Sequence, residues 1–197
     1  KIVCVGRNYA EHAKELNNPI PTEPILFIKP ESSAVSLSNN LNIPSVDCHY
    51  EAEIAVLIGS SLTSANEAEA VAAIVGVGLG LDLTRRSLQS RLKEKSHPWE
   101  IAKSFDGACP LTDFVKSDQF SDLTKLQFSL HINDELKQCG NSEDMLNPII
   151  PLIAHMSTYF TLKPGDIILT GTPKGVGELH SGDSLEFDLM GKINIKT

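Results

Sequence analysis

The sequence predicts an α+β domain in which β-strands dominate and about four helices are attached. Its 197 residues, 41% hydrophobic and 21% charged, are enough for a single domain with a sizeable core. Short apolar runs typical of strands recur along the chain and are separated by glycine, proline and asparagine. Strand-like and helix-like segments do not alternate regularly, as a doubly wound parallel sheet would require.

In the first half of the chain, predicted strands and helices are interspersed. A helix is expected over residues 8–16, which have helical composition and precede a proline-rich stretch. Residues 64–67 fit a capping box, which introduces a second helix. The glycine-interrupted apolar run 75–83 favours a strand, and Thr84 is expected to cap a third helix that continues to Lys95. The other strands of this half are predicted over residues 2–5, 24–29, 35–43 and 51–58.

The second half of the chain predicts a hairpin, a long helix and a run of short strands. Residues 125–132 and the segment from Leu136 onward flank Asn133-Asp134, a pair typical of a hairpin turn. Asn147-Pro148 starts a helix with proline in its first turn. The apolar residues of this helix recur at helical spacing: Ile149, Ile150, Leu152, Ile153, Met156 and Phe160. The final strands are predicted over residues 166–170, 184–190 and 192–196.

Charge and cysteine usage exclude several classes of protein. The 17 basic and 25 acidic residues give a net charge of −8, which disfavours nucleic acid and anionic membrane surfaces as partners. The four cysteines show no CxxC spacing, so neither a zinc site nor a disulfide framework is indicated. The uncharged apolar run over residues 70–81 is too short and glycine-rich to span a bilayer. We expect a cytoplasmic protein, in the bacterial cytosol or, for a eukaryotic source, the mitochondrial matrix.

Three carboxylates point to a divalent metal site. Glu51 and Glu53 stand two residues apart at the head of an alternating apolar run, so on a strand they project from the same face. Two such charges repel unless a cation or a proton lies between them. Asp82 follows apolar and glycine residues, where an unpaired charge is costly to bury. Oxygen ligands of this kind suit Mg²⁺. The alternative is that the two glutamates lie on a solvated strand face and Asp82 caps the next helix.

A histidine and a glutamate form a candidate acid–base pair. On a helix His12 and Glu15 are neighbours at i, i+3. A carboxylate that accepts a hydrogen bond from one imidazole nitrogen leaves the other free to take a proton. The alternative is an ordinary surface pair. The proline-rich segment 19–24 favours a movable element, which suits a lid over a substrate.

Two further segments are candidates for contact with an anion. Lys103 lies among apolar neighbours, which suits a buried cation that binds a substrate carboxylate or a developing oxyanion. The alternative is a surface lysine. Residues 169–177 form a loop of small residues whose backbone amides can hold an anionic group, although the Gly-Lys-Ser/Thr of a Walker A loop is absent. Such loops are also common as simple tight turns.

Six motifs in one order cover almost the whole chain. They are GRNYAEHAKE at 6–15, FIKP at 27–30, HYEAEIAVLIG at 49–59, LDLTRRSLQ at 81–89, PWEIAKSFD at 98–106 and GDIILTGTPKGVG at 165–177. Together they resemble the fumarylacetoacetate hydrolase family, in particular its small single-domain branch of acylpyruvate hydrolases and oxaloacetate-acting enzymes. The resemblance implies a mixed β-roll or sandwich with peripheral helices, a single catalytic domain over residues 1–197, a mobile lid over residues 1–20 and a homodimer.

The resemblance also assigns roles to individual residues. It implies that Glu51, Glu53 and Asp82 ligate Mg²⁺ or Mn²⁺, with Ca²⁺ as a non-physiological occupant. His12 and Glu15 are then the catalytic dyad on the lid, and Lys103 activates water or stabilises the oxyanion. The residues expected to line the substrate site are Arg86, Gln89 and Thr172. The run 83–86 departs from the NDVSAR-like pattern common in the family, which bears on specificity.

The expected activity is metal-dependent hydrolysis of a C–C bond in acylpyruvate-type 2,4-diketo acids such as fumarylpyruvate or acetylpyruvate, with pyruvate enolate as the leaving group. An alternative uses the same site to decarboxylate oxaloacetate or to interconvert its keto and enol forms. A third interpretation, a non-catalytic metal-binding module, predicts a degraded dyad, whereas His12, Glu15 and Lys103 are all present.

Overall fold

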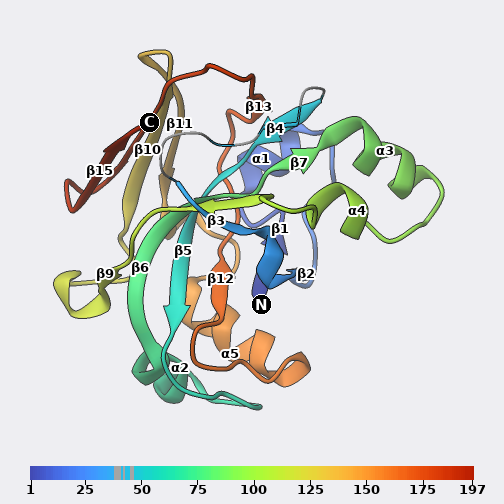
Figure 1. The fold of residues 1–197 in the computed structure, drawn as a ribbon. Coiled ribbons are helices and arrows are strands. Elements are labelled where there is room, and N and C mark those ends of the chain that lie inside the picture. The colour runs from blue at the N-terminus through green and yellow to red at the C-terminus, as the bar shows by residue number, and fades with distance from the viewer. Residues whose placement is uncertain (38–40, 42, 45–46) are drawn as a thin grey trace.

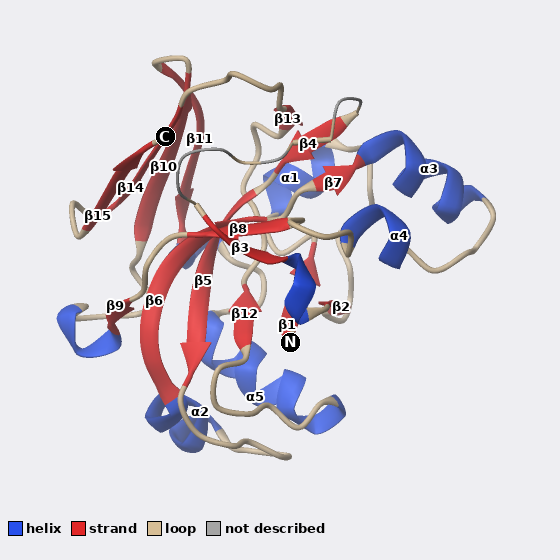
Figure 2. Ribbon diagram, in the orientation of Figure 1, coloured by secondary structure: helices blue, strands red, loops and turns tan. Residues whose placement is uncertain are grey.

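A curled, mixed sheet forms the centre of the molecule (Figures 1 and 2). The computed structural model describes residues 1–37, 41, 43–44 and 47–197. The strands of the main sheet follow the order β2 (Ile25–Lys29), β1 (Ile2–Gly6), β12 (Ile167–Leu169), β5 (Ala52–Ile58), β6 (Ile74–Leu81), β8 (Cys109–Leu111) and β3 (Ala34–Ser36), and β9 (Val115–Lys116) also pairs with β6. The pairs β1–β12 and β3–β8 are parallel and the others antiparallel. The predicted sheet-dominated α+β fold is therefore confirmed.

In the described part of the chain, two smaller sheets accompany the main sheet. One contains, in order, β11 (Glu135–Asn141), β10 (Gln127–Ile132), β14 (Leu185–Leu189) and β15 (Ile193–Lys196). The other contains β13 (Gly177–Glu178), β4 (Cys48–Tyr50) and β7 (Thr84–Arg85). The predicted hairpin corresponds to β10 and β11, with Asn133 and Asp134 at positive φ in its turn.

The described residues form five α-helices outside the sheets: α1 (Ala10–Glu15), α2 (Glu67–Ala73), α3 (Arg86–Glu94), α4 (Glu100–Lys103) and α5 (Ile149–Tyr159). The predicted capping box begins α2, because the Asn66 side chain accepts from the Glu69 amide and the Glu69 side chain accepts from the Asn66 amide. α2 and α5 pack against each other at one end of the main sheet (Figure 1). Short 3-10 helices cover Glu31–Ser33, Ser117–Gln119 and Ser142–Asp144.

The core explains why β5 does not alternate between polar and apolar residues. Nearly every residue of β5 is buried, because the sheet is covered on both faces at this strand. Apolar side chains from both larger sheets and from α5 form one continuous cluster, which includes Ile54, Leu81, Leu130, Ile153 and Phe187. The two acidic residues at the start of this apolar strand are therefore buried as well.

Three local predictions differ from the structure. Thr84 does not cap a helix; it belongs to β7, and its buried hydroxyl donates to the carbonyl of Asp82 at 3.0 Å. The expected strand over 35–43 is observed only as β3, and part of its remainder lies outside the described residues. Ile2–Gly6 forms a buried strand of the main sheet, so the lid prediction can apply only to the segment after Gly6. The helix α4 was not expected, because four residues carry too little periodicity to indicate one.

Candidate active site

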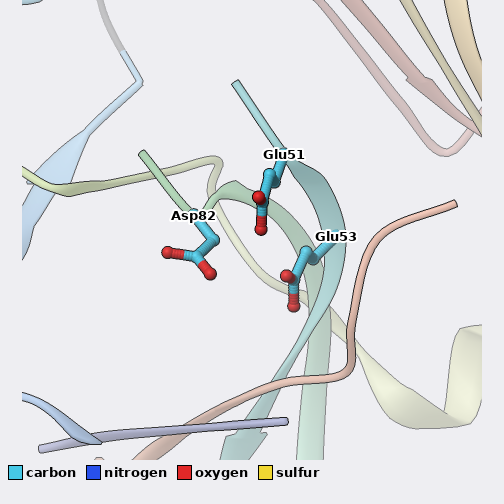
Figure 3. A group of neighbouring side chains, drawn as sticks. All are labelled: Glu51, Glu53 and Asp82. Carbon is cyan, nitrogen blue, oxygen red and sulfur yellow. The ribbon is translucent and has the colours of Figure 1, made fainter. Parts of the chain in front are cut away.

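Antiparallel pairing of β5 and β6 brings the three acidic residues together. Ala52 is paired with Leu81, so Glu51 precedes β5 beside Asp82, which follows β6. The Asp82 amide donates to the Glu51 carbonyl at 2.8 Å. One oxygen from each of Glu51, Glu53 and Asp82 lies within 4.8 Å of the others, and Figure 3 shows the three carboxyl groups facing a common space. The i, i+2 spacing thus predicted the geometry correctly.

Buried cations surround this carboxylate cluster. The Lys103 Nζ lies 3.0 Å from Glu51 Oε2 and 2.5 Å from Asp82 Oδ2, and it also donates to the Thr84 hydroxyl at 2.7 Å. Arg86 donates to the other oxygen of Glu51. Lys103 is only 4% exposed, which excludes the surface-lysine alternative.

A second buried lysine completes the arrangement. Lys29 in β2 is fully buried, and its Nζ lies 2.8 Å from Asp82 Oδ1. The same ammonium donates to the carbonyls of Lys103, Leu83 and Ala108. Sequence reasoning missed Lys29, although the argument used for Asp82, a charge within an apolar run, applies equally to the FIKP motif.

The charges of these groups follow from their neighbours. Burial alone would raise the pKa of Glu51, but Lys103 and Arg86 lower it well below its usual range. Burial alone would lower the pKa of Lys103, but Asp82 and Glu51 raise it, so this side chain is an ammonium at neutral pH. Burial and the negative charges of Asp82 and Glu51 raise the pKa of Glu53 well above its usual value. Glu53 is thus the member of the cluster that most lacks a counter-charge.

The donor set fits a hard divalent cation. Glu53 accepts from the Gly171 amide at 2.6 Å but has no cationic partner within ion-pair distance in the described part of the chain. Asp82 Oδ1 is buried and accepts no hydrogen bond from any described residue, even though Lys29 lies close to it. A cation bound by one oxygen from each of the three carboxylates would stabilise the negative charges of Glu53 and Asp82. The alternative of a solvated strand face and a helix cap is wrong, since all three side chains are buried and Asp82 caps no helix.

The histidine and glutamate of α1 form the predicted pair. His12 Nδ1 lies 3.3 Å from Glu15 Oε2. His12 is 4% exposed, which excludes an ordinary surface pair, and it lines the same cleft as the three carboxylates. Glu15 lies behind it and accepts from the Gly175 amide at 2.9 Å through its other oxygen. The carboxylate therefore fixes the imidazole and ties α1 to the glycine-rich loop.

The glycine-rich loop binds protein carboxylates rather than an open anion site. Its amides at Gly171 and Gly175 donate to Glu53 and Glu15, respectively. Both glycines have positive φ, and a Cβ at Gly175 would lie 2.1 Å from the Lys137 carbonyl oxygen. The prediction that backbone amides of this loop bind an anionic group is confirmed, but the anionic groups are the carboxylates of Glu53 and Glu15.

One narrow cleft gathers the remaining predicted residues. Arg86 donates to the Gln89 side chain at 2.9 Å, and both line the cleft beside Glu51. The Thr172 hydroxyl donates to the Ala52 carbonyl at 2.8 Å and also lines it. Gln138 of β11, which no sequence signal indicated, donates to the Thr172 hydroxyl at 2.8 Å and accepts from the Ala52 amide at 2.9 Å. The cleft lining also includes residues that sequence reasoning did not single out: Arg7, Phe27, Lys93 and Trp99.

The fold and this cleft define a sheet-rich enzyme with a candidate divalent-metal centre next to a histidine dyad. Residues 1–196 match the fumarylacetoacetate (FAA) hydrolase C-terminal family, and the chain belongs to that family of enzymes. It is 50% identical over 188 residues to the oxaloacetate tautomerase YcgM of Escherichia coli, covering 94% of this chain and 86% of that protein. It is 39% identical to the mitochondrial oxaloacetate tautomerase of Homo sapiens, covering 98% and 89% of the two chains.

A solved structure in the family carries a metal. The crystal structure of fumarylpyruvate hydrolase from Pseudomonas aeruginosa in complex with Mn²⁺ and pyruvate matches with a TM-score of 0.92 and 32% identity, covering 99% of this chain and 87% of that one. No helix among the described residues is long and apolar enough to cross a membrane.

Proposed function

We propose that this protein is an oxaloacetate tautomerase that interconverts the enol and keto forms of oxaloacetate. The observation that carries this proposal is the 50% identity to the oxaloacetate tautomerase of Escherichia coli along 94% of the chain. The comparisons therefore favour the alternative activity over the C–C bond hydrolysis that was expected first. Decarboxylation of oxaloacetate is the second candidate activity, because a Dictyostelium discoideum relative named oxaloacetate decarboxylase is 40% identical to this chain.

The proposed cofactor is Mg²⁺ or Mn²⁺, held by Glu51, Glu53 and Asp82. The buried carboxylate cluster and the Mn²⁺ complex of the Pseudomonas aeruginosa hydrolase support this assignment. When bound, such an ion supplies Lewis-acid stabilisation of the negative charge that develops on a keto acid as it loses a proton. Conversion of an enol into a ketone transfers a proton from oxygen to carbon and consumes no water.

His12 and Lys103 have complementary tasks in this transfer. The Nδ1 of His12 is held by Glu15, so its other ring nitrogen is available to exchange a proton with the substrate carbon. The Lys103 ammonium, which remains charged, stabilises the enolate oxygen. Arg86, Gln89 and Thr172 bind and orient the substrate from the same cleft.

Progress curves distinguish this activity from C–C bond cleavage. Enol-oxaloacetate, acetylpyruvate and fumarylpyruvate are each added to the protein with Mg²⁺ and, separately, with EDTA. We expect rapid Mg²⁺-dependent loss of the enol form and much slower formation of pyruvate from the two diketo acids. Rapid cleavage of either diketo acid without enol conversion would show that the protein is an acylpyruvate hydrolase instead.

Replacement of the histidine tests the acid–base assignment. His12→Gln should lower kcat for enol conversion about 10²–10⁴-fold, because general acid–base catalysis contributes about that much. Glu11→Gln on the same helix is the matched control; its exposed ion pair with Lys14 contributes little to stability. Melting temperatures of both variants should stay near that of the wild type. Full activity in a folded His12→Gln protein would remove the dyad from the mechanism.

The remaining parts of the proposal concern location and assembly. We retain a cytoplasmic location, or the mitochondrial matrix for a eukaryotic source, and several eukaryotic relatives are named mitochondrial. The homodimer, the keto acid substrate and the absence of nucleic-acid and membrane partners stay predictions from the sequence.

A further inference from the structure

Two positive side chains in the cleft have no task in the proposed mechanism. Arg7 follows β1 directly and has a positive φ of 58°, and Lys93 lies in the last turn of α3. Both are half-buried and line the same cleft as Glu51, Glu53 and Asp82. Their presence in the cleft therefore needs a separate explanation.

Neither cation has a carboxylate partner in the described part of the chain. The three cations beside the metal-binding carboxylates, Lys29, Lys103 and Arg86, all form ion pairs, whereas no ion pair involves Arg7 or Lys93. The residues outside the described part are all neutral: Ser38, Asn39, Asn40, Asn42, Ser45 and Val46. Glu51 acts on Lys93 through its charge, but it forms no ion pair with Lys93 and is already paired with Lys103 and Arg86.

The two charges act on each other. Burial, followed by the positive charges of Arg7, Arg86 and Lys103, lowers the pKa of Lys93 to about 8. Burial also lowers the pKa of Arg7. Like charges that are brought together and partly removed from water raise the free energy of a site, and a bound anion lowers it again. The Lys93 Nζ lies 5.1 Å from the centre of the Trp99 ring, which holds this ammonium at the cleft wall.

The cleft is lined by the three carboxylates with Lys103, where the 2-oxo acid end of a substrate would bind, and also by Arg7 and Lys93. A four-carbon dicarboxylic keto acid carries a second carboxylate beyond its reacting carbon, whereas a monocarboxylic acid such as acetylpyruvate would leave both cations unpaired.

We propose that Arg7 and Lys93 form a second carboxylate-binding site that selects dicarboxylic over monocarboxylic 2-oxo acids. The inference rests on the proposed function, because it assumes that the 2-oxo acid end binds at the carboxylate cluster. It assigns specificity to residues that take no part in the proton transfer. Arg7 and Lys93 are specificity residues, and the reaction itself is left to His12 and Lys103.

The test compares two non-reacting ligands that differ in the second carboxylate. L-Malate and L-lactate share a 2-hydroxy acid end, but only malate has the distal carboxylate. Trp99 is the single tryptophan of the chain and lies beside Lys93, so its fluorescence reports binding, and calorimetry provides an independent dissociation constant. The variants are Lys93→Met and Arg7→Gln, each in the Mg²⁺-loaded protein, with Lys95→Met as the control because Lys95 is exposed and outside the cleft.

The wild type should bind malate at least about tenfold more tightly than lactate, since a charge-assisted pair in a partly buried site is strong. Lys93→Met and Arg7→Gln should each weaken the binding of malate about tenfold or more and change the affinity for lactate less than about twofold. Lys95→Met should change neither. Equal weakening of both ligands, or no loss of malate affinity in the Lys93 and Arg7 variants, would overturn the proposal.

The binding experiment tests the second carboxylate site independently of the proposed tautomerase activity. These dissociation constants require no turnover, so selective malate binding by a protein that fails to convert enol-oxaloacetate would reject only the activity. Conversely, a tautomerase that binds malate and lactate equally would reject only the second carboxylate site. No ion pair among the described residues involves Arg7 or Lys93, so a large drop in melting temperature in both variants would also count against the proposal.

Discussion

Asp82→Asn should lower kcat/KM for enol-oxaloacetate about a thousandfold or more. The carboxamide removes one of three negative ligands from the cluster, and Lewis-acid stabilisation of several kcal/mol depends on a correctly bound ion. A loss of about 4 kcal/mol in transition-state stabilisation corresponds to about a thousandfold in rate. Steady-state kinetics at saturating Mg²⁺ measure this effect, and Asp113→Asn, at an exposed acidic residue, is the control.

The same variant separates metal binding from structural support. Asp82 also neutralises Lys103 and Lys29, so its replacement should lower the free energy of unfolding by about 3–5 kcal/mol even without metal. The informative quantity is the increase in melting temperature on addition of Mg²⁺, since a ligand that binds only the native state stabilises it. The wild type should show this increase and Asp82→Asn should not. An equal increase in both proteins would exclude Asp82 as a ligand.

Lys103→Met should damage both folding and catalysis. Removing the ammonium leaves Glu51 and Asp82 buried with one fewer counter-charge, which should cost about 3–5 kcal/mol of stability. Loss of the group that stabilises the enolate oxygen should lower kcat about 10²–10³-fold. Chemical denaturation and steady-state kinetics measure the two effects.

Lys29→Met is the matched comparison for Lys103→Met. Lys29 is equally buried and also pairs with Asp82, but it does not line the cleft. Its replacement should therefore cost similar stability, while the folded fraction keeps much more of its turnover than Lys103→Met does. If both variants lose turnover equally, Lys103 acts by holding Asp82 and makes no direct contribution to catalysis.

The candidate metal ligands could be picked out from the sequence because they break a local rule. Glu51, Glu53 and Asp82 place charges within apolar segments, and such charges are tolerated in a core only with partners. The same rule identifies Lys29 once it is applied to the FIKP motif. The motif resemblance covered almost the whole chain and agrees with the family match over residues 1–196.

Other features could not be derived from local pattern. The Gln138 side chain forms hydrogen bonds with the Thr172 hydroxyl and the Ala52 amide, which lie far from it in sequence. A single polar residue on a strand does not indicate such contacts. Arg7 and Lys93 likewise line one cleft although they lie far apart in sequence, and no local pattern indicates this. Hydrolysis of an acylpyruvate releases an enolate and tautomerisation of oxaloacetate passes through one, so residue types alone did not favour the activity that the relatives support.

An anomalous difference map from crystals grown with Mn²⁺ tests the central claim most directly. We expect one strong peak in contact with carboxylate oxygens of Glu51, Glu53 and Asp82, because these are the buried oxygen donors that converge on one point. Absence of a peak there at saturating Mn²⁺, with Lys103 still bridging Glu51 and Asp82, would contradict the account.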